Sequence, residues 1–166
     1  MARKPTHADA QLLLQLYEMR REPELRRARQ WFLTEFKPAS WNEIKTRYLS
    51  HSMEDRWFRM TISYWEMVGT LVNRGVLHEE LFFDHTGEDV VTWSRCESWI
   101  AEARADIRVT YLYQFERMVK GHLAFRISAN AEFAKSRKKS AVPSVRRRPK
   151  TAAKGATRRK PGERRR

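Results

Sequence analysis

The chain has 166 residues, of which 34 are Lys or Arg and 20 are Asp or Glu, so its formal net charge is +14. Its apolar runs are short, such as the three residues 12–14, and none approaches the roughly 20 residues that span a bilayer. The charged N-terminus has no apolar stretch behind it, which excludes an ordinary secretory signal, and the single cysteine, Cys96, excludes an intrachain disulfide and favours a reducing cytoplasm.

The positive charge is confined to the C-terminal end. Residues 135–166 contain fifteen Lys or Arg and one acid, Glu163, whereas residues 1–134 contain nineteen basic and nineteen acidic residues and all nineteen aromatic residues. A segment without large apolar side chains cannot offset the entropy of ordering. We therefore predict a flexible N-terminus (1–7), a neutral, aromatic-rich helical domain (8–134) and a disordered polybasic tail (135–166).

Helical periodicity predicts the first elements of the domain. Over residues 8–21, one helical face collects Leu12, Leu13, Leu16 and Met19. A second helix is expected to start at Pro23, which suits a first helical turn, and to stop before Pro38. Ser40 followed by Glu43 is a capping-box pattern that predicts a short helix to about residue 49.

The segment 53–74, preceded by a capping Ser52, predicts a central helix. Its polar residues form one narrow stripe and the rest are mostly large and apolar, as expected of a mostly buried helix; the stripe comprises Arg59, Ser63, Glu66, Thr70 and Asn73. Gly75 is expected to end this helix as its C′ cap. Gly69 costs the helix about 1 kcal/mol relative to alanine, which close helix–helix contact could offset.

Three further segments complete the predicted domain. Residues 76–83 form a short apolar segment, 88–104 a helix with Cys96 and Trp99 on one face, and 108–134 a last helix. The apolar stripe of that last helix is Tyr111, Phe115, Met118, His122, Phe125, Ala129 and Phe133. The predicted fold class is all-α, a compact bundle or array of about five to seven helices without a substantial sheet.

The tail carries the clearest functional signal. Its basic clusters are separated by small residues and prolines, a spacing that suits the regular charge of nucleic-acid phosphates. It has no aromatic side chain to stack on bases and no fixed structure to present an arginine to a base edge, so sequence readout is not expected. The predicted phosphate-binding residues are Arg137, Lys138, Lys139, Arg146, Arg147, Arg148, Lys150, Lys154, Arg158, Arg159, Lys160, Arg164, Arg165 and Arg166.

Other partners stay open. The same charge would attract an acidic membrane surface, although no lipidation motif or amphipathic insertion helix adjoins it. A second function class is a helical protein–protein interaction or scaffold domain that binds a protein partner or itself, with an auxiliary tail. A lesser alternative is a winged-helix-like DNA-binding regulator over 41–83, although the central helix offers few exposed basic residues for it. No small-molecule ligand and no cofactor are inferred.

No catalytic constellation is found, and the protein is expected not to be an enzyme. His78 and His85 lie among acids, but without three convergent ligands they are expected to be capped, solvent-facing polar residues, and no metal site is predicted. His122 is expected to be a hydrogen-bonded core histidine because it lies on the apolar stripe. Cys96 is expected to be a buried, inert thiol.

Two segments, LYEMRREPELRRAR at 16–29 and YWEMVGTLVNRGVLHEEL at 64–81, resemble a family of small bacterial proteins known as a domain of unknown function. The resemblance covers roughly residues 8–105. It implies two short helices, a long helix that ends in an Arg-Gly turn, and a short acidic helix, in a domain that faces the cytosol. It brings no catalytic residues, and some members of that family are membrane-tethered. The composition of the tail resembles the Lys/Ala/Pro-rich tails of linker histones and bacterial histone-like proteins.

Overall fold

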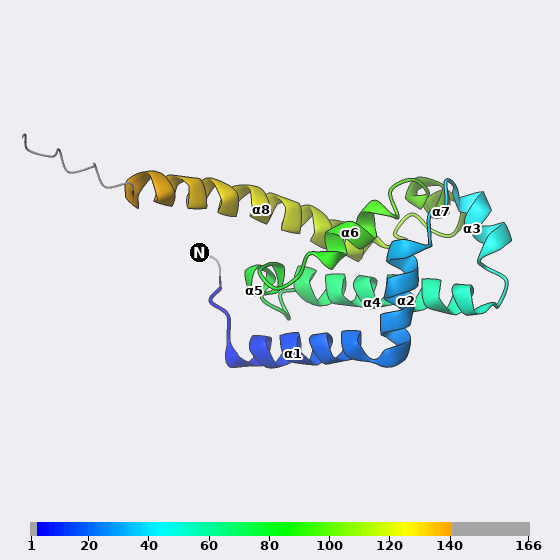
Figure 1. The fold of residues 1–166 in the computed structure, drawn as a ribbon, viewed down its shortest axis with the longest axis horizontal. Helices are drawn as coiled ribbons and strands as arrows, with labels where there is room; N and C mark the ends of the chain where they lie inside the picture. The colour runs from blue at the N-terminus through cyan, green and yellow to red at the C-terminus, as the bar shows by residue number, and fades with distance from the viewer. Residues whose placement is uncertain (1–2, 141–166) are drawn as a thin grey trace, which may run out of the picture.

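The computed structural model of the chain describes residues 3–140, and these form an all-helical fold (Figure 1). The helices of the described residues are α1 (His7–Arg21), α2 (Pro23–Thr34), α3 (Trp41–Arg47), α4 (Met53–Asn73), α5 (Glu79–Phe83), α6 (Glu88–Ser94), α7 (Ile100–Asp106) and α8 (Tyr113–Ser140). The predicted all-α class is confirmed for these residues. Within residues 3–140, no helix combines the length and the apolar character needed to cross a membrane.

Helix α4 is the centre of the fold, as its narrow polar stripe predicts. It packs against α8 on one side and α2 on another. In Figure 1, α1, α4 and α8 run along the long axis of the molecule, α2 crosses α4, and α3 and α7 lie at one end while α5 lies at the other. Three helices that share one direction and a fourth that crosses them enclose a single core.

Aromatic rings fill the end of the core where α2, α3, α4 and α7 meet. Phe36 is fully buried and lies within 5.4 Å of Phe58 and 6.4 Å of Trp99, measured between ring centroids. Trp99 stacks on Trp41 at 5.8 Å. The rings are therefore in contact at distances typical of stabilising aromatic pairs, and the aromatic-rich composition of the domain is explained by its core.

The predicted helix caps are present. The Ser40 and Ser52 hydroxyls each accept a hydrogen bond from a backbone N–H three residues later, at 3.2 Å. Gly75 has φ +69°, and Val76 N donates to the carbonyl of Leu71 at 3.0 Å, so α4 ends in a Schellman motif. These boundaries were predictable because each depends on neighbours in the sequence.

Eight helices lie in the described residues, one more than the predicted maximum of seven. The predicted helix over 88–104 is interrupted between α6 and α7, because the backbone tightens there into i→i−3 hydrogen bonds such as Cys96 N to the carbonyl of Trp93 at 2.7 Å. The indole of Trp99 donates to the carbonyl of Arg95 at 2.8 Å and holds this turn. The segment 76–83, predicted only as a short apolar stretch, contains α5.

The two longest helices meet at Gly69. A Cβ atom at this position would lie 2.5 Å from the carbonyl oxygen of Gln114, so only glycine allows the observed approach of α4 and α8. Glu66, on the polar stripe of α4, accepts a hydrogen bond from Phe115 N at 2.8 Å, and Asn73 donates to the Gln114 carbonyl at 2.8 Å. The prediction that a helix–helix contact explains Gly69 is confirmed, and two residues of the polar stripe, Glu66 and Asn73, anchor the first turn of α8.

The last part of α8 extends past the other helices (Figure 1). His122 is the last buried residue that the structure describes on this helix, and all residues from 130 to 137 are exposed. Phe133, predicted to continue the packed stripe, is 66 % exposed. Helix α8 continues past the predicted boundary at 134 as far as Ser140. Its last part therefore lies beyond the core that the rest of the helix covers.

Candidate functional site

The predicted phosphate-binding residues fall at and beyond the projecting end of α8. Arg137 is exposed on this helix, and Lys138 and Lys139 belong to its last turn. Eleven predicted residues lie outside the described residues: Arg146, Arg147, Arg148, Lys150, Lys154, Arg158, Arg159, Lys160, Arg164, Arg165 and Arg166. The candidate site that the structure does describe is a groove within the helical domain.

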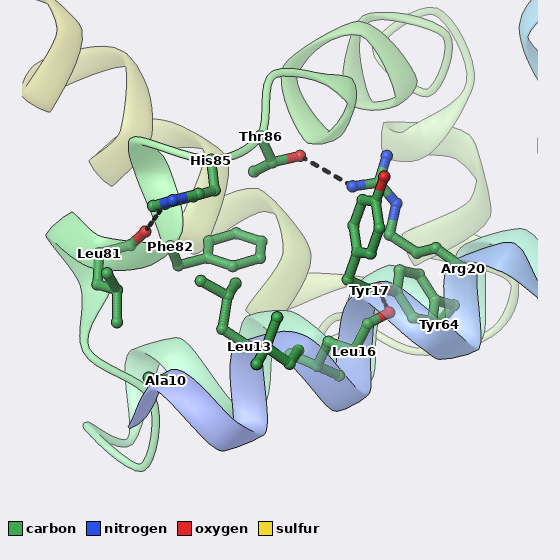
Figure 2. Close-up of a pocket in the computed structure, with 11 residues that line it drawn as sticks. Ala10, Leu13, Leu16, Tyr17, Arg20, Tyr64, Leu81, Phe82, His85 and Thr86 are labelled. Atoms are coloured by element: carbon green, nitrogen blue, oxygen red, sulfur yellow. Dashed lines mark hydrogen bonds between the residues drawn. The ribbon is translucent and has the colours of Figure 1, made fainter. Parts of the chain in front are cut away.

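An apolar groove lies between α1 and α5, with Tyr64 of α4 at its floor (Figure 2). Its volume is about 410 Å³, which falls in the range typical of small-molecule sites. Its walls are mainly leucine and aromatic side chains: Ala10, Leu13, Leu14, Leu16 and Tyr17 from α1, and Leu81 and Phe82 from α5. Leu14 is 64 % exposed and Tyr17 is 55 % exposed, so the groove is open along α1.

Two polar side chains along the groove are already bonded within the protein. The Tyr64 hydroxyl donates to the carbonyl of Leu16 at 3.1 Å, and burial raises the pKa of this phenol above its ordinary value. His85 follows α5, and its Nδ1 lies 2.8 Å from the carbonyl of Leu81 in that helix (Figure 2). The groove therefore offers a ligand apolar contact along its length, with few polar groups that need a hydrogen-bond partner.

Arginines gather where the groove ends, at the junction of α1 and α2. Arg20 lines both the groove and a neighbouring hollow of about 330 Å³, whose other lining residues are Tyr17, Arg21, Arg26 and Arg29. Glu88 of α6 binds Arg20 at 2.7 Å and also accepts hydrogen bonds from Arg29. Burial opposes ionisation of Glu88, but the hydrogen bonds and charge of the two arginines outweigh it and hold its pKa below the ordinary value.

A buried polar network lies behind α5. His122 and Asp89 are both fully buried, and His122 Nδ1 lies 2.7 Å from the Asp89 carboxylate. Arg126 Nε donates to His122 Nε2 at 3.0 Å, so Nε2 is the acceptor and Nδ1 carries the hydrogen that Asp89 receives. The imidazole also stacks on Phe83 at 4.6 Å. The prediction that His122 is a hydrogen-bonded core histidine is confirmed.

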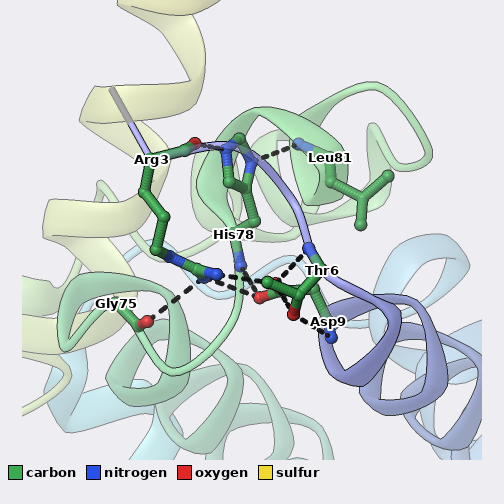
Figure 3. Close-up of polar contacts among 6 residues, drawn as sticks. All are labelled: Arg3, Thr6, Asp9, Gly75, His78 and Leu81. Atoms are coloured by element: carbon green, nitrogen blue, oxygen red, sulfur yellow. Dashed lines mark hydrogen bonds and ion pairs between the residues drawn. The ribbon is translucent and has the colours of Figure 1, made fainter. Parts of the chain in front are cut away.

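The N-terminal segment is held against the turn after α4 (Figure 3). Arg3 makes two hydrogen bonds of 2.7 Å to the Asp9 carboxylate, which also accepts from Thr6 N at 2.7 Å and from His78 N at 2.8 Å. The ring of His78 contacts the Arg3 carbonyl and accepts from Leu81 N at 3.2 Å as the N-cap of α5. Residues 3–6, placed by the sequence in a flexible segment, thus make a defined set of contacts.

Asp9 gives this N-terminal segment a testable pH dependence. Hydrogen bonds from Arg3 and then Thr6 hold the pKa of Asp9 below its ordinary value of about 4. A depressed pKa means that the carboxylate stabilises the fold above pH 4 and that this contribution is lost as the pH falls further. In thermal melts, the Tm difference between the full chain and Asp9→Asn is expected to be largest at pH 7 and to shrink by pH 3. The exposed Asp84→Asn is the control, and an Asp9 difference that is constant with pH would contradict this role.

The remaining candidate residues are structural. His78 is buried and N-caps α5, so the prediction of a solvent-facing residue is wrong for it: its ring contacts the Arg3 carbonyl and accepts from Leu81 N. His85 is exposed. Cys96 is fully buried, which confirms the buried part of its prediction, and burial raises the pKa of its thiol. Within the described part of the chain, no three His, Cys, Asp or Glu converge as metal ligands.

The winged-helix alternative over 41–83 is wrong for this fold. It needs a hairpin after the long helix, but residues 71–83 form the end of α4, the Gly75 turn and α5, and residues 3–140 contain no strand. It also needs an exposed recognition helix. Helix α4 is instead packed between α2 and α8, with Trp65 and Val68 fully buried.

The structure thus defines a class: a compact helical domain with an apolar groove and a projecting C-terminal helix. The chain belongs to the family described as a domain of unknown function, DUF4760, whose model matches residues 5–122. No curated protein and no solved structure matches the chain. The match ends at His122, the last buried residue described on α8. The projecting end of α8 and the basic residues of 135–166 therefore lie outside the matched region.

The groove was not predicted from the sequence. Two local signals pointed toward it: the leucines at 12–14 and 16 exceed what one buried helical face requires, and five arginines crowd into residues 20–29. Neither signal reveals that α5 and Thr86 close over α1. Arg20 Nη1 lies 3.5 Å from the Thr86 hydroxyl across 66 positions of sequence, a contact that only the tertiary fold creates.

Proposed function

We propose that the protein is a non-enzymatic binding protein whose C-terminal basic residues contact nucleic-acid phosphates without reading sequence. One observation carries this proposal: the whole net charge of +14 belongs to residues 135–166, while the domain before them is neutral. A neutral fold has no net attraction for a polyanion, so binding would depend on the appended charges.

The placement of α8 supports this division of roles. Lys135 and Arg137 are exposed on the part of the helix that extends past the fold. Because residues 135–166 contain no aromatic residue, contacts to phosphates rather than stacking on bases are expected.

Removal of residues 135–166 tests the proposal. Among the described residues, the truncation removes no buried side chain, because Lys135, Ser136 and Arg137 are exposed, and the fold of the remaining chain should persist. At low salt, its affinity for duplex DNA and for RNA is expected to fall about 100-fold or more, since phosphate contacts supply most non-specific affinity. A full-length control with the order of residues 135–166 shuffled should bind like the natural chain. Equal binding by the truncated and full-length proteins would refute the proposal.

A protein–protein interaction role is the second candidate, and it rests on a different observation. The projecting part of α8 exposes apolar side chains: Leu123 (43 %), Ile127 (73 %) and Phe133 (66 %). Such a stripe suits a second copy of the chain or another helical partner. The same truncated protein separates the two functions, because it keeps this stripe. The second candidate would be favoured if the truncated protein still self-associates and if truncation leaves nucleic-acid binding unchanged.

A further inference from the structure

The apolar groove and the arginine-lined hollow beside it form one continuous amphipathic surface. They share Tyr17 and Arg20, so the leucine-lined walls lead directly to the guanidinium groups at the junction of α1 and α2. Figure 2 shows the Tyr17 ring standing beside Arg20 at this end, with Leu13 and Phe82 facing each other further along. A ligand that fills both parts would need an apolar body and a polar end.

The charge at the polar end favours an anion. Among the described residues, Glu88 is the one carboxylate that binds this group, and it is engaged by Arg20 and Arg29. Arg21 and Arg26 also line the hollow, both are exposed, and neither forms an ion pair with a described residue. Positive charge therefore exceeds negative charge at the end of the groove, and guanidinium groups bind carboxylate and phosphate oxygens well.

Arg20 joins the two parts of this surface, because it lines both the groove and the hollow. Its Nη2 binds Glu88 at 2.7 Å, and its guanidinium carbon lies 5.6 Å from the centroid of the Trp65 ring. The guanidinium is therefore already positioned, so an anion that binds there need not order this side chain.

We propose that this surface binds a single-chain alkyl anion, with the alkyl chain in the α1–α5 groove and a carboxylate or phosphate head against Arg20, Arg21 and Arg26. The walls give the chain apolar contact and little competition from polar groups. The arginines give the head charge-assisted hydrogen bonds. This site is independent of the nucleic-acid contacts of residues 135–166, and each can fail without the other.

A chain-length series on the full-length protein tests the site. Alkanoates from octanoate to hexadecanoate, each below its micelle concentration, would be titrated by calorimetry. Affinity is expected to rise roughly three- to fourfold per added methylene until the groove is filled, with one ligand per chain. Dodecyl phosphate should bind comparably to dodecanoate, whereas dodecanol and dodecyltrimethylammonium should bind at least tenfold more weakly. Affinity independent of chain length, or equal binding of the cationic amphiphile, would overturn the proposal.

Matched variants locate the binding. Leu14→Glu places a negative charge in the open wall of the groove and should weaken dodecanoate binding by at least tenfold, whereas Val109→Glu, at a residue 83 % exposed and outside the groove, should not. Arg21→Ser with Arg26→Ser should weaken it similarly, and the exposed Arg56→Ser should not. All of these proteins keep residues 135–166. If the basic tail held the ligand, every variant would bind dodecanoate equally well, and that result would refute the site. Binding to anionic phosphatidylglycerol vesicles without binding to monomeric dodecanoate would also refute it.

Discussion

Gly69→Ala is expected to lower the free energy of unfolding by about 2 kcal/mol or more, although alanine is the better helix former by about 1 kcal/mol. The added Cβ would lie 2.5 Å from the Gln114 carbonyl oxygen and 2.9 Å from Phe115 N. These are backbone atoms, so the clash can be relieved only by moving α8 away from α4. That movement would also stretch the hydrogen bond from Phe115 N to Glu66.

Gly121→Ala is the matched control for Gly69→Ala. Gly121 also lies inside a helix, but a Cβ there would meet the Phe83 ring at 3.6 Å, an ordinary van der Waals distance. This variant is expected to be as stable as the natural protein or up to about 1 kcal/mol more stable. Urea unfolding of both variants measures the comparison. If both substitutions stabilise the protein equally, α4 and α8 are not in the close contact described.

Asp89→Ala is expected to destabilise the protein by about 3 kcal/mol. Asp89 is fully buried and accepts the Nδ1 hydrogen of His122 at 2.7 Å, while Arg126 donates to the other ring nitrogen. Removing Asp89 leaves the buried Nδ1–H of His122 without an acceptor, which costs about 1–3 kcal/mol, and the cavity left by the missing carboxylate adds to this loss. The measurement is again the free energy of unfolding in urea.

Two comparisons make the Asp89 result specific. The exposed Asp84→Ala should change stability by about 0.5 kcal/mol or less. In the double variant Asp89→Ala with His122→Phe, the buried N–H is also removed, so the combined loss should be smaller than the sum of the two single losses. Strict additivity would show that Asp89 and His122 do not depend on one another.

The parts of the fold that could be predicted are those fixed by sequence neighbours. The caps at Ser40 and Ser52 and the turn at Gly75 depend on residues one to four positions away, and the burial of α4 follows from its own periodicity. The break between α6 and α7 was missed because the apolar periodicity of 88–104 continues through it. What interrupts the helix is a local set of tighter hydrogen bonds around Trp99, which periodicity does not register.

The candidate site illustrates the opposite limit. His122 could be recognised as a core residue from its position on the apolar stripe, but its partner Asp89 lies 33 positions away and looked like a helix-start charge. The groove likewise requires α1 and α5 to meet, and Glu88 to reach Arg20 across 68 positions. Such pairs depend on how the helices pack against one another. A single sequence predicts the individual helices but not their packing.

The salt dependence of DNA binding tests the central claim, that a neutral domain carries a separate phosphate-binding segment. For the full-length protein on duplex DNA, log affinity should fall linearly with log salt, with a slope steeper than about −5 and no steeper than about −13 if fifteen basic residues take part at about 0.9 per contact. The slope should be the same on unrelated DNA sequences, and the protein that ends at residue 134 should show a slope near zero. A steep slope that persists after truncation would contradict the claim, because the helical domain would then supply the contacts.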